Sequence, residues 1–298
     1  MAISPAREAA FDILLRIERQ DAYASELLHS SQYTRLSAAD HGLATELVMG
    51  VLRWRSLLDG QITPYSSQPL EKLDTEVLTA LRLAAYQLSF LDRIPERAAV
   101  HESVELVKRS RKRSAVPFAN AVLRKLSHAA GGGRDTPPVI RSGTIAQLSE
   151  SSAHPLWLVE RWARQFGQAA TNQICEYDQS VPGTSVRMAS ASVEKELLLE
   201  NVVLAPGRML ASARRVQSGD LTQTRAFREG RVSIQDEASQ LTALLVGHAS
   251  TILDCCAAPG GKTRILASEN PNAMLVAVEL HPHRARLLRK LVPTRMCR

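Results

Sequence analysis

An apolar run that meets a glycine pair, TILDCCAAPGGKT from Thr251 to Thr263, restricts the fold of this chain more than any other feature. The helical pattern EASQLTALLVG precedes it, and the helical pattern KTRILASE and a second apolar run, AMLVAVEL, follow it. This order of helix, strand, glycine turn, helix and strand predicts the opening of a doubly wound α/β sheet. In such a sheet the first strand-to-helix turn meets its ligand through the backbone, and an acid about 20 residues later accepts hydrogen bonds from ribose hydroxyls. Glu279 ends the second run, so the sequence predicts an adenosyl ligand at this turn.

The same glycine pair invites comparison with the phosphate-binding loop of nucleotide triphosphatases, whose pattern is G-x-x-x-x-G-K-[ST]. Cys256 stands where that pattern needs its first glycine, and Pro259 lacks the amide that a phosphate cradle uses. These two departures argue against a triphosphatase. A tight turn at Gly260 and Gly261 that binds no ligand stays open as an alternative.

Helical periodicity runs through almost all of the first 130 residues. Ser4-Pro5 begins one helix, and Ser37 begins a second, whose apolar face consists of Leu43, Leu47, Val51, Trp54, Leu58 and Ile62. Asp74 caps a third helix that ends before Pro95, and two amphipathic segments follow around residues 100–107 and 118–126. Five or more helices with short connections predict a compact bundle.

The composition changes abruptly at AAGGGRDTPP, residues 129–138, which has the features of a flexible connection. We therefore divide the chain into a helical domain (1–130), a linker (131–150), a small α+β domain (151–235) and the start of an α/β domain (236–298). In the α+β domain, GTSVRMAS and GRVSIQDEAS are β-rich. HPLWLVERWARQFG predicts a helix whose core-facing side chains are Trp157, Leu158, Trp162 and Phe166.

Composition narrows the class of protein. With 298 residues, 45% hydrophobic content and no run of about 18 apolar residues, we expect a soluble, cytoplasmic globular protein. Its four cysteines lack paired C-x-x-C spacing, so we expect reduced thiols and no metal site. The net charge of +7 favours a polyanionic partner.

At the level of motifs, LDCCAAPGGKT resembles the S-adenosylmethionine-binding motif of the Sun (Fmu, RsmB) family of RNA 5-methylcytosine methyltransferases, Asp-x-Cys-Ala-Ala-Pro-Gly-Gly-Lys-Thr. LATELVMGVLRWRSLLDGQI and FANAVLRK resemble the family's NusB-like helical domain, and HPLWLVERWARQFG resembles its small middle domain. The resemblance implies a Rossmann-like methyltransferase domain, small-subunit ribosomal RNA as the partner, and no DNA or membrane partner. It also implies that the methyl donor is lined by Cys256, Ala257, Ala258, Pro259, Gly260, Gly261 and Lys262. Glu279 would hold the ribose, where the family usually has Asp, and Asp254 would either contact the donor or only cap the loop.

The family's catalytic thiolate lies in a Thr-Cys motif supported by a Pro-Cys motif, and neither motif occurs in this sequence. We therefore expect a C-terminally truncated chain with no catalytic residue of its own, the nucleophilic cysteine lying beyond Arg298, and no activity of the chain alone. Cys255 and Cys256 sit at the cofactor turn, and Cys297 lacks the family's flanking residues. A non-enzymatic RNA-binding fragment is the alternative function.

The densest basic segment, VKRSRKR, offers candidate RNA contacts at Lys108, Arg109, Arg111, Lys112 and Arg113. The segment VLRK adds Arg124 and Lys125. A solvated helix end, favoured by the helix dipole, explains the same charges without RNA. Trp54 between Arg53 and Arg55 combines charge with a stacking ring, although Trp54 also fits the apolar stripe of its helix.

Overall fold

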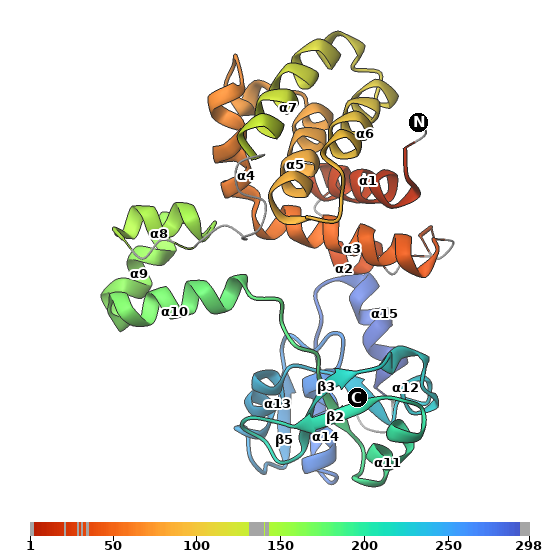
Figure 1. Ribbon diagram of the computed structural model, residues 1–298. Coiled ribbons are helices and arrows are strands. Elements are labelled where there is room, and N and C mark those ends of the chain that lie inside the picture. Colours follow the sequence, from red (N-terminus) through yellow and green to blue (C-terminus); the bar gives the residue numbers. More distant parts are fainter. Residues whose placement is uncertain are drawn as a thin grey trace. The chain divides into compact units, whose positions relative to one another are not determined.

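The computed structural model describes residues 3–20, 22–28, 30, 32–33, 36–130, 140 and 143–292, and the notation below follows Figure 1. The chain divides into two compact units, residues 1–180 and 181–298. Within the described ranges, no helix is both long and apolar enough to span a membrane.

The first unit is entirely helical in its described residues (Figure 1). Its α-helices are α1 (Pro5–Gln20), α2 (Ala24–Leu28), α3 (Ala38–Arg53), α4 (Arg55–Ile62), α5 (Thr75–Phe90), α6 (Glu96–Arg109), α7 (Val116–Ala130), α8 (Ile145–Ser151), α9 (Leu156–Phe166) and α10 (Gln168–Gln179). Short 3-10 helices occur at η1 (Thr63–Tyr65), η2 (Leu70–Lys72) and η3 (Arg113–Ala115). The predicted helical bundle is confirmed.

The bundle buries its apolar stripes around α5, whose side chains from Ala80 to Ala85 are almost all inaccessible. A buried polar network joins three helices of this core. Arg7 of α1 donates to the carboxylate of Glu102 on α6 at 3.0 Å and to Gln87 Oε1 on α5 at 2.6 Å. A buried charge is tolerated when it has an opposite charge and hydrogen-bond partners beside it. This network therefore holds α1, α5 and α6 in one arrangement.

Two local predictions differ from the structure. The helix expected from Ser37 to Ile62 is two helices, because the backbone leaves the helical region at Trp54 (φ −101°, ψ 14°). Residues 131–139 of the predicted linker lie outside the described residues, while its end already forms α8. Thr144 and Gln147 begin α8 with a reciprocal capping box, a helix signal that the glycine-rich composition before it obscured.

The second unit contains two sheets. Its strands are β1 (Ser185–Met188), β2 (Val203–Pro206), β3 (Ala213–Ser218), β4 (Val232–Ile234), β5 (Thr251–Asp254) and β6 (Met274–Ala277). Its helices are α11 (Ser192–Leu199), α12 (Arg225–Arg228), α13 (Glu237–Leu244), α14 (Gly261–Glu269) and α15 (Pro282–Leu291), with the 3-10 turn η4 (Leu221–Gln223). The first sheet is antiparallel in the order β2-β3-β1-β4, and β5 pairs in parallel with β6, Ile252 opposite Leu275. The predicted α+β segment and the start of a Rossmann-like sheet are both present.

The two sheets are tied together across residue 235, where the sequence suggested a domain boundary. Glu237 of α13 accepts hydrogen bonds from the amides of Arg208, Met209 and Leu210 in the β2–β3 turn, at 2.9, 2.6 and 2.6 Å. Arg264 of α14 donates to the carbonyl of Gly230, just before β4. The four-part division stays a prediction. In the structure, α9 and α10 of the predicted third part belong to the first compact unit, whereas residues 181–235 form one compact unit with the predicted fourth part.

The rest of the described chain covers only one face of the β5–β6 pair. Ile252 and Leu275 are buried, whereas Leu253 and Met274 are 62% and 53% exposed. Parallel sheets are usually covered on both faces, so the exposed face of β5 and β6 is an unusual feature of this pair.

Candidate functional site

The glycine turn between β5 and α14 is held closed by Asp254. One carboxylate oxygen accepts from the amide of Cys256 at 3.3 Å, and the other accepts from the hydroxyl of Thr263 at 2.7 Å. The Thr263 hydroxyl also lies 3.3 Å from the carbonyl of Ala257. Asp254 therefore acts as the cap of the loop, the second of the two roles that its sequence position allowed.

The end of β6 lies beside the same loop, as the sequence predicted. The Ala257 amide donates to the carbonyl of Val278 at 3.1 Å, and Arg284 donates to the carbonyl of Ala258 at 3.2 Å. The pKa of Glu279 lies below its ordinary value because its carboxylate accepts the His281 amide at 3.0 Å, with Arg284 and the Ala258 amide adding to this effect. An ionised acceptor is therefore fixed next to the turn.

The two glycines of the turn have different neighbours. Gly260 has φ +113°, a conformation that side-chain-bearing residues rarely adopt, and an added Cβ would lie 2.6 Å from Val292 Cγ2 and 3.2 Å from Leu288 Cδ1. At Gly261 an added Cβ would lie 3.2 Å from the side-chain amide of Gln235. Gly260 thus makes room for α15, and Gly261 makes room for a polar side chain.

The predicted cofactor residues present unequal surfaces. Ala257 and Ala258 are buried under Leu288 and Val292, so they can meet a ligand only through their backbone. The remaining members of the set are accessible to different degrees: Cys256, Pro259 and Lys262 are exposed, Gly261 and Glu279 are half-buried, and Gly260 is buried.

Sequence reasoning missed Gln235, which lies just before α13. Its side chain is 9% exposed, and its Nε2 has no hydrogen-bond partner among the described residues. A buried amide donor without a partner is costly, and here it lies against the N-terminal turn of α14, where backbone amides are also free to bind an anion. An orphaned donor, free helix amides and an ionised carboxylate fit a ligand with a carboxylate and ribose hydroxyls. No hydrophobic or helical period marks a residue of this kind.

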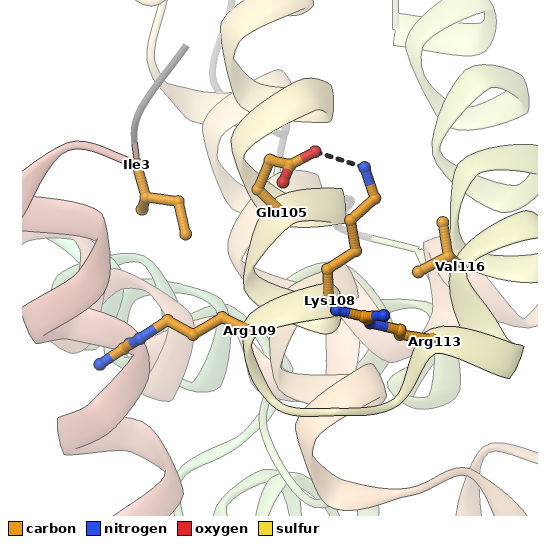
Figure 2. A pocket seen from close by; sticks show the side chains of 6 residues that line it. All are labelled: Ile3, Glu105, Lys108, Arg109, Arg113 and Val116. Atoms are coloured by element: carbon orange, nitrogen blue, oxygen red, sulfur yellow. Dashed lines mark hydrogen bonds and ion pairs between the residues drawn. The ribbon is translucent and has the colours of Figure 1, made fainter.

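The basic segment forms one wall of a hollow of about 580 Å³ lined by Ile3, Glu105, Lys108, Arg109, Arg113 and Val116 (Figure 2). Lys108 pairs with Glu105, three residues earlier on α6, at 2.5 Å (Figure 2). Arg109 pairs with Glu8 and Asp12 of α1 at 2.7 and 3.2 Å, and Lys112 pairs with Asp74 at 2.9 Å. Asp74 also raises the pKa of Lys112. Three of the five predicted RNA contacts are therefore neutralised within the chain.

Arg111 and Arg113 differ from the other three cations. Both are exposed, and neither forms an ion pair with any described residue. Arg111 adopts φ +61°, and the Lys112 amide bonds the carbonyl of Val107, so the chain leaves α6 by a left-handed C-terminal turn without a glycine. This turn directs the residues after α6 away from the helix.

A second hollow, of about 450 Å³, continues along α6 and α7 and shares Glu105, Lys108 and Val116 with the first. Its lining adds three exposed basic residues. Arg124 belongs to the basic VLRK segment noted in the sequence, whereas sequence reasoning did not single out Arg97 and His101. Arg97 and His101 lie about one turn apart on α6, so no basic run in the sequence marks them.

The remaining candidates are structural or lie outside the description. Trp54 is 7% exposed and packs on Phe90 at 4.9 Å between ring centroids, so it belongs to the core. Cys175 is buried, Cys255 and Cys256 are exposed, and Cys297 is outside the described residues. No cluster of metal-ligating side chains occurs in the part of the chain that the structure describes.

A glycine turn between a parallel strand and a helix, joined to an acid after the neighbouring parallel strand, defines the cofactor-binding opening of a Rossmann-like domain. Here that opening follows a helical bundle. Comparison with known families agrees with both parts: residues 4–128 match the model of the NusB family, and residues 241–296 match the model of the 16S rRNA methyltransferase RsmB/F family.

Similarity to individual proteins extends over nearly the whole chain. It is 33% identical over 295 residues to a probable ribosomal RNA small subunit methyltransferase B of Bacillus subtilis, covering 95% of this chain and 64% of that protein. A protein of the same description from Synechocystis is 31% identical over 88% of this chain and 60% of its own length. The chain thus spans less than two thirds of these relatives. The crystal structure of PH0851 shares the fold with a TM-score of 0.72 at 20% identity, covering 99% of this chain and 68% of that one.

Proposed function

We propose that this chain binds S-adenosylmethionine at the β5–α14 turn and acts, in the cytoplasm, in methylation of a cytosine ring carbon of small-subunit ribosomal RNA. The observation that carries the proposal is the closed turn itself, in which Asp254 fixes the loop beside the ionised carboxylate of Glu279. The similarity to the RsmB/F family and to ribosomal RNA small subunit methyltransferases supports the substrate class.

Each group near the turn has a separate task in this proposal. Glu279 accepts hydrogen bonds from the ribose hydroxyls, because the His281 amide holds its carboxylate beside the turn. Gln235 Nε2 and the free amides at the start of α14 bind the carboxylate of the donor. The donor, when bound, supplies an electrophilic methyl group. The residues of the turn hold it in place and take no part in bond making.

Methylation at a cytosine ring carbon also needs a thiolate that attacks the adjacent carbon. Cys175 is buried, and burial raises the pKa of its thiol, which disfavours the thiolate. Cys255 and Cys256 lie on the loop assigned to the donor. The proposal therefore assigns the attack to none of these three residues.

The RNA-binding half of the proposal rests on the helical unit. Arg111 and Arg113 are exposed and without an ion pair among the described residues, so they are the members of the basic segment best placed to bind phosphates. Lys108, Arg109 and Lys112 bind carboxylates, and we assign them a smaller part.

Donor binding is tested by equilibrium dialysis of labelled S-adenosylmethionine against the chain. We expect saturable binding that S-adenosylhomocysteine displaces, and that Glu279→Gln and Gln235→Leu both weaken. Glu200→Gln, a change of the same charge in the same unit away from the turn, is the control and should leave binding unchanged. Loss of the native gene should also remove one bisulfite-resistant cytosine from the small-subunit ribosomal RNA.

The results separate the enzyme from the alternative function. Displaceable donor binding together with the missing 5-methylcytosine supports the methyltransferase. If the chain binds structured ribosomal RNA but no donor, and the bisulfite pattern is unchanged, then the methyltransferase proposal is wrong and the chain is a non-enzymatic RNA-binding module.

A further inference from the structure

Trp157, near the start of α9, is exposed in spite of its size. It was expected in the core, yet 63% of its surface is accessible, while Trp54 is 7% exposed and Trp162 is half-buried against His154 at 5.6 Å between rings. Val159 is the fully buried residue of this helix instead. A large ring left in water forfeits the burial that usually stabilises tryptophan, so its exposure points to a contact with another molecule.

Two arginines share the exposed side of α9 with Trp157. At about 100° per residue, Arg161 and Arg164 lie about 40° and 20° from the direction of Trp157, on either side of it, and about 6 and 10 Å further along the axis. Both are exposed, and neither pairs with a carboxylate of the described chain. Glu160 lies at the edge of this stripe and forms no ion pair with Arg164 there. Trp157, Arg161 and Arg164 are called the α9 stripe below.

The surface beside the α9 stripe is hollowed. Arg164 and Glu160 line a hollow of about 550 Å³ together with Ile145, Ala163 and Gln168. Figure 1 shows α9 grouped with α8 and α10 in the helical unit. The stripe thus combines a flat aromatic surface, two uncompensated positive charges and an adjoining depression.

We propose that the α9 stripe is a binding site for unpaired RNA, with a nucleobase stacked on the Trp157 ring and neighbouring phosphates on Arg161 and Arg164. The inference rests on the proposed function, because it takes RNA as the partner, and it adds the form of RNA recognised. A base in a single strand offers its flat face to an aromatic ring, whereas a base in a duplex is already stacked. The arginines select a polyanion over an uncharged apolar partner.

The test compares an unstructured oligoribonucleotide with a perfect duplex of the same sequence, using the whole chain at fixed salt. Trp157→Ala should weaken binding of the single strand roughly five- to 150-fold, the range for loss of one stacked base, and should leave duplex binding unchanged. Arg161→Gln with Arg164→Gln should lower the salt slope for the single strand by about 1.4.

Phe166 provides a matched control on the same helix. It is 51% exposed, and nine residues of helix place it about 180° from Trp157. Phe166→Ala removes a comparable exposed ring from the opposite side of the helix. Because that side lies away from the α9 stripe, this variant should leave the affinity for both RNAs unchanged. Because Trp157 is the most accessible of the three tryptophans, stacking should also quench the emission of the parent, and Trp157→Phe should abolish that quenching while it retains part of the affinity.

Each outcome bears on the inference. Selective loss of single-strand binding in Trp157→Ala, with Phe166→Ala at the parental affinity, supports it. Parental affinity in Trp157→Ala, or equal losses in both variants, overturns the inference but leaves the proposed function intact. A parent chain that binds no RNA overturns both.

Discussion

The ion pairs of the basic segment lead to a quantitative prediction about RNA binding. If all five cations reached phosphates, replacing them would lower the slope of log affinity against log salt by about 3.5 to 4.5, at about 0.7 to 0.9 for each phosphate. Lys108, Arg109 and Lys112 are already neutralised by carboxylates at 2.5 to 3.2 Å. A paired cation must give up its carboxylate to reach a phosphate, so its contribution to counterion release is smaller.

The double variant Arg111→Gln, Arg113→Gln should therefore account for most of the decrease in the slope of log affinity against log salt. It removes the two cations of the segment that have no carboxylate partner among the described residues, which lowers the slope by about 1.4 to 1.8. Over a tenfold range of salt, this difference corresponds to about 25- to 60-fold in affinity. Sequence preference should not change, because phosphate contacts position RNA without reading bases.

Filter binding of a structured small-subunit ribosomal RNA fragment at several salt concentrations measures these slopes. The triple variant with glutamine at Lys108, Arg109 and Lys112 is the control, since it removes more charge from the same segment and should flatten the slope less. Parallel lines for the parent and the double variant would show a solvated helix end. A larger change in the triple variant would refute the argument from ion pairing.

Three further predictions concern stability. Glu102→Gln should lower the free energy of unfolding by about 3 to 5 kcal/mol in denaturant titration, because Arg7 then stays buried without its charged partner, and a change below about 1 kcal/mol would contradict this. Gly260→Ala should cost about 1 to 3 kcal/mol more than Gly247→Ala, since both have positive φ but only Gly260 meets a neighbour, and equal melting temperatures would rule out that contact. The amide hydrogen bonds of the Arg208–Leu210 turn lower the pKa of Glu237, so its contribution to stability is present above the ordinary value of 4.5 and is lost as the pH falls below it. The difference in melting temperature between the parent and Glu237→Gln should therefore shrink in acid, and a constant difference would exclude this linkage.

Local patterns in the sequence were sufficient for the order of elements. The alternation of apolar runs, glycine turn and helical period placed β5, α14 and β6, and the apolar stripes placed α1, α3, α5, α6 and α7. The closeness of Glu279 to the turn also followed from the sequence, because neighbouring parallel strands end at the same edge of a sheet. These features depend on residues a few positions apart, and so they can be read from periodicity and turn chemistry.

Contacts between distant residues were decided only by the tertiary structure. Arg109 forms ion pairs with Glu8 and Asp12, about a hundred positions earlier in the chain, and these pairs compete with phosphate binding. No pattern in the sequence around Arg109 indicates these ion pairs. The Gln235 amide is a candidate ligand contact only because the fold places it against Gly261.

The helix around Trp157 shows the same limit most clearly. Periodicity correctly predicted that α9 is amphipathic, but it could not say how much of the apolar surface its neighbours would cover. Among the described elements, α8 and α10 pack most closely on α9, and they bury Val159 while Trp157 and Phe166 stay in solvent. A sequence specifies which side chains favour burial, whereas the number and placement of neighbouring elements determine which of them are buried.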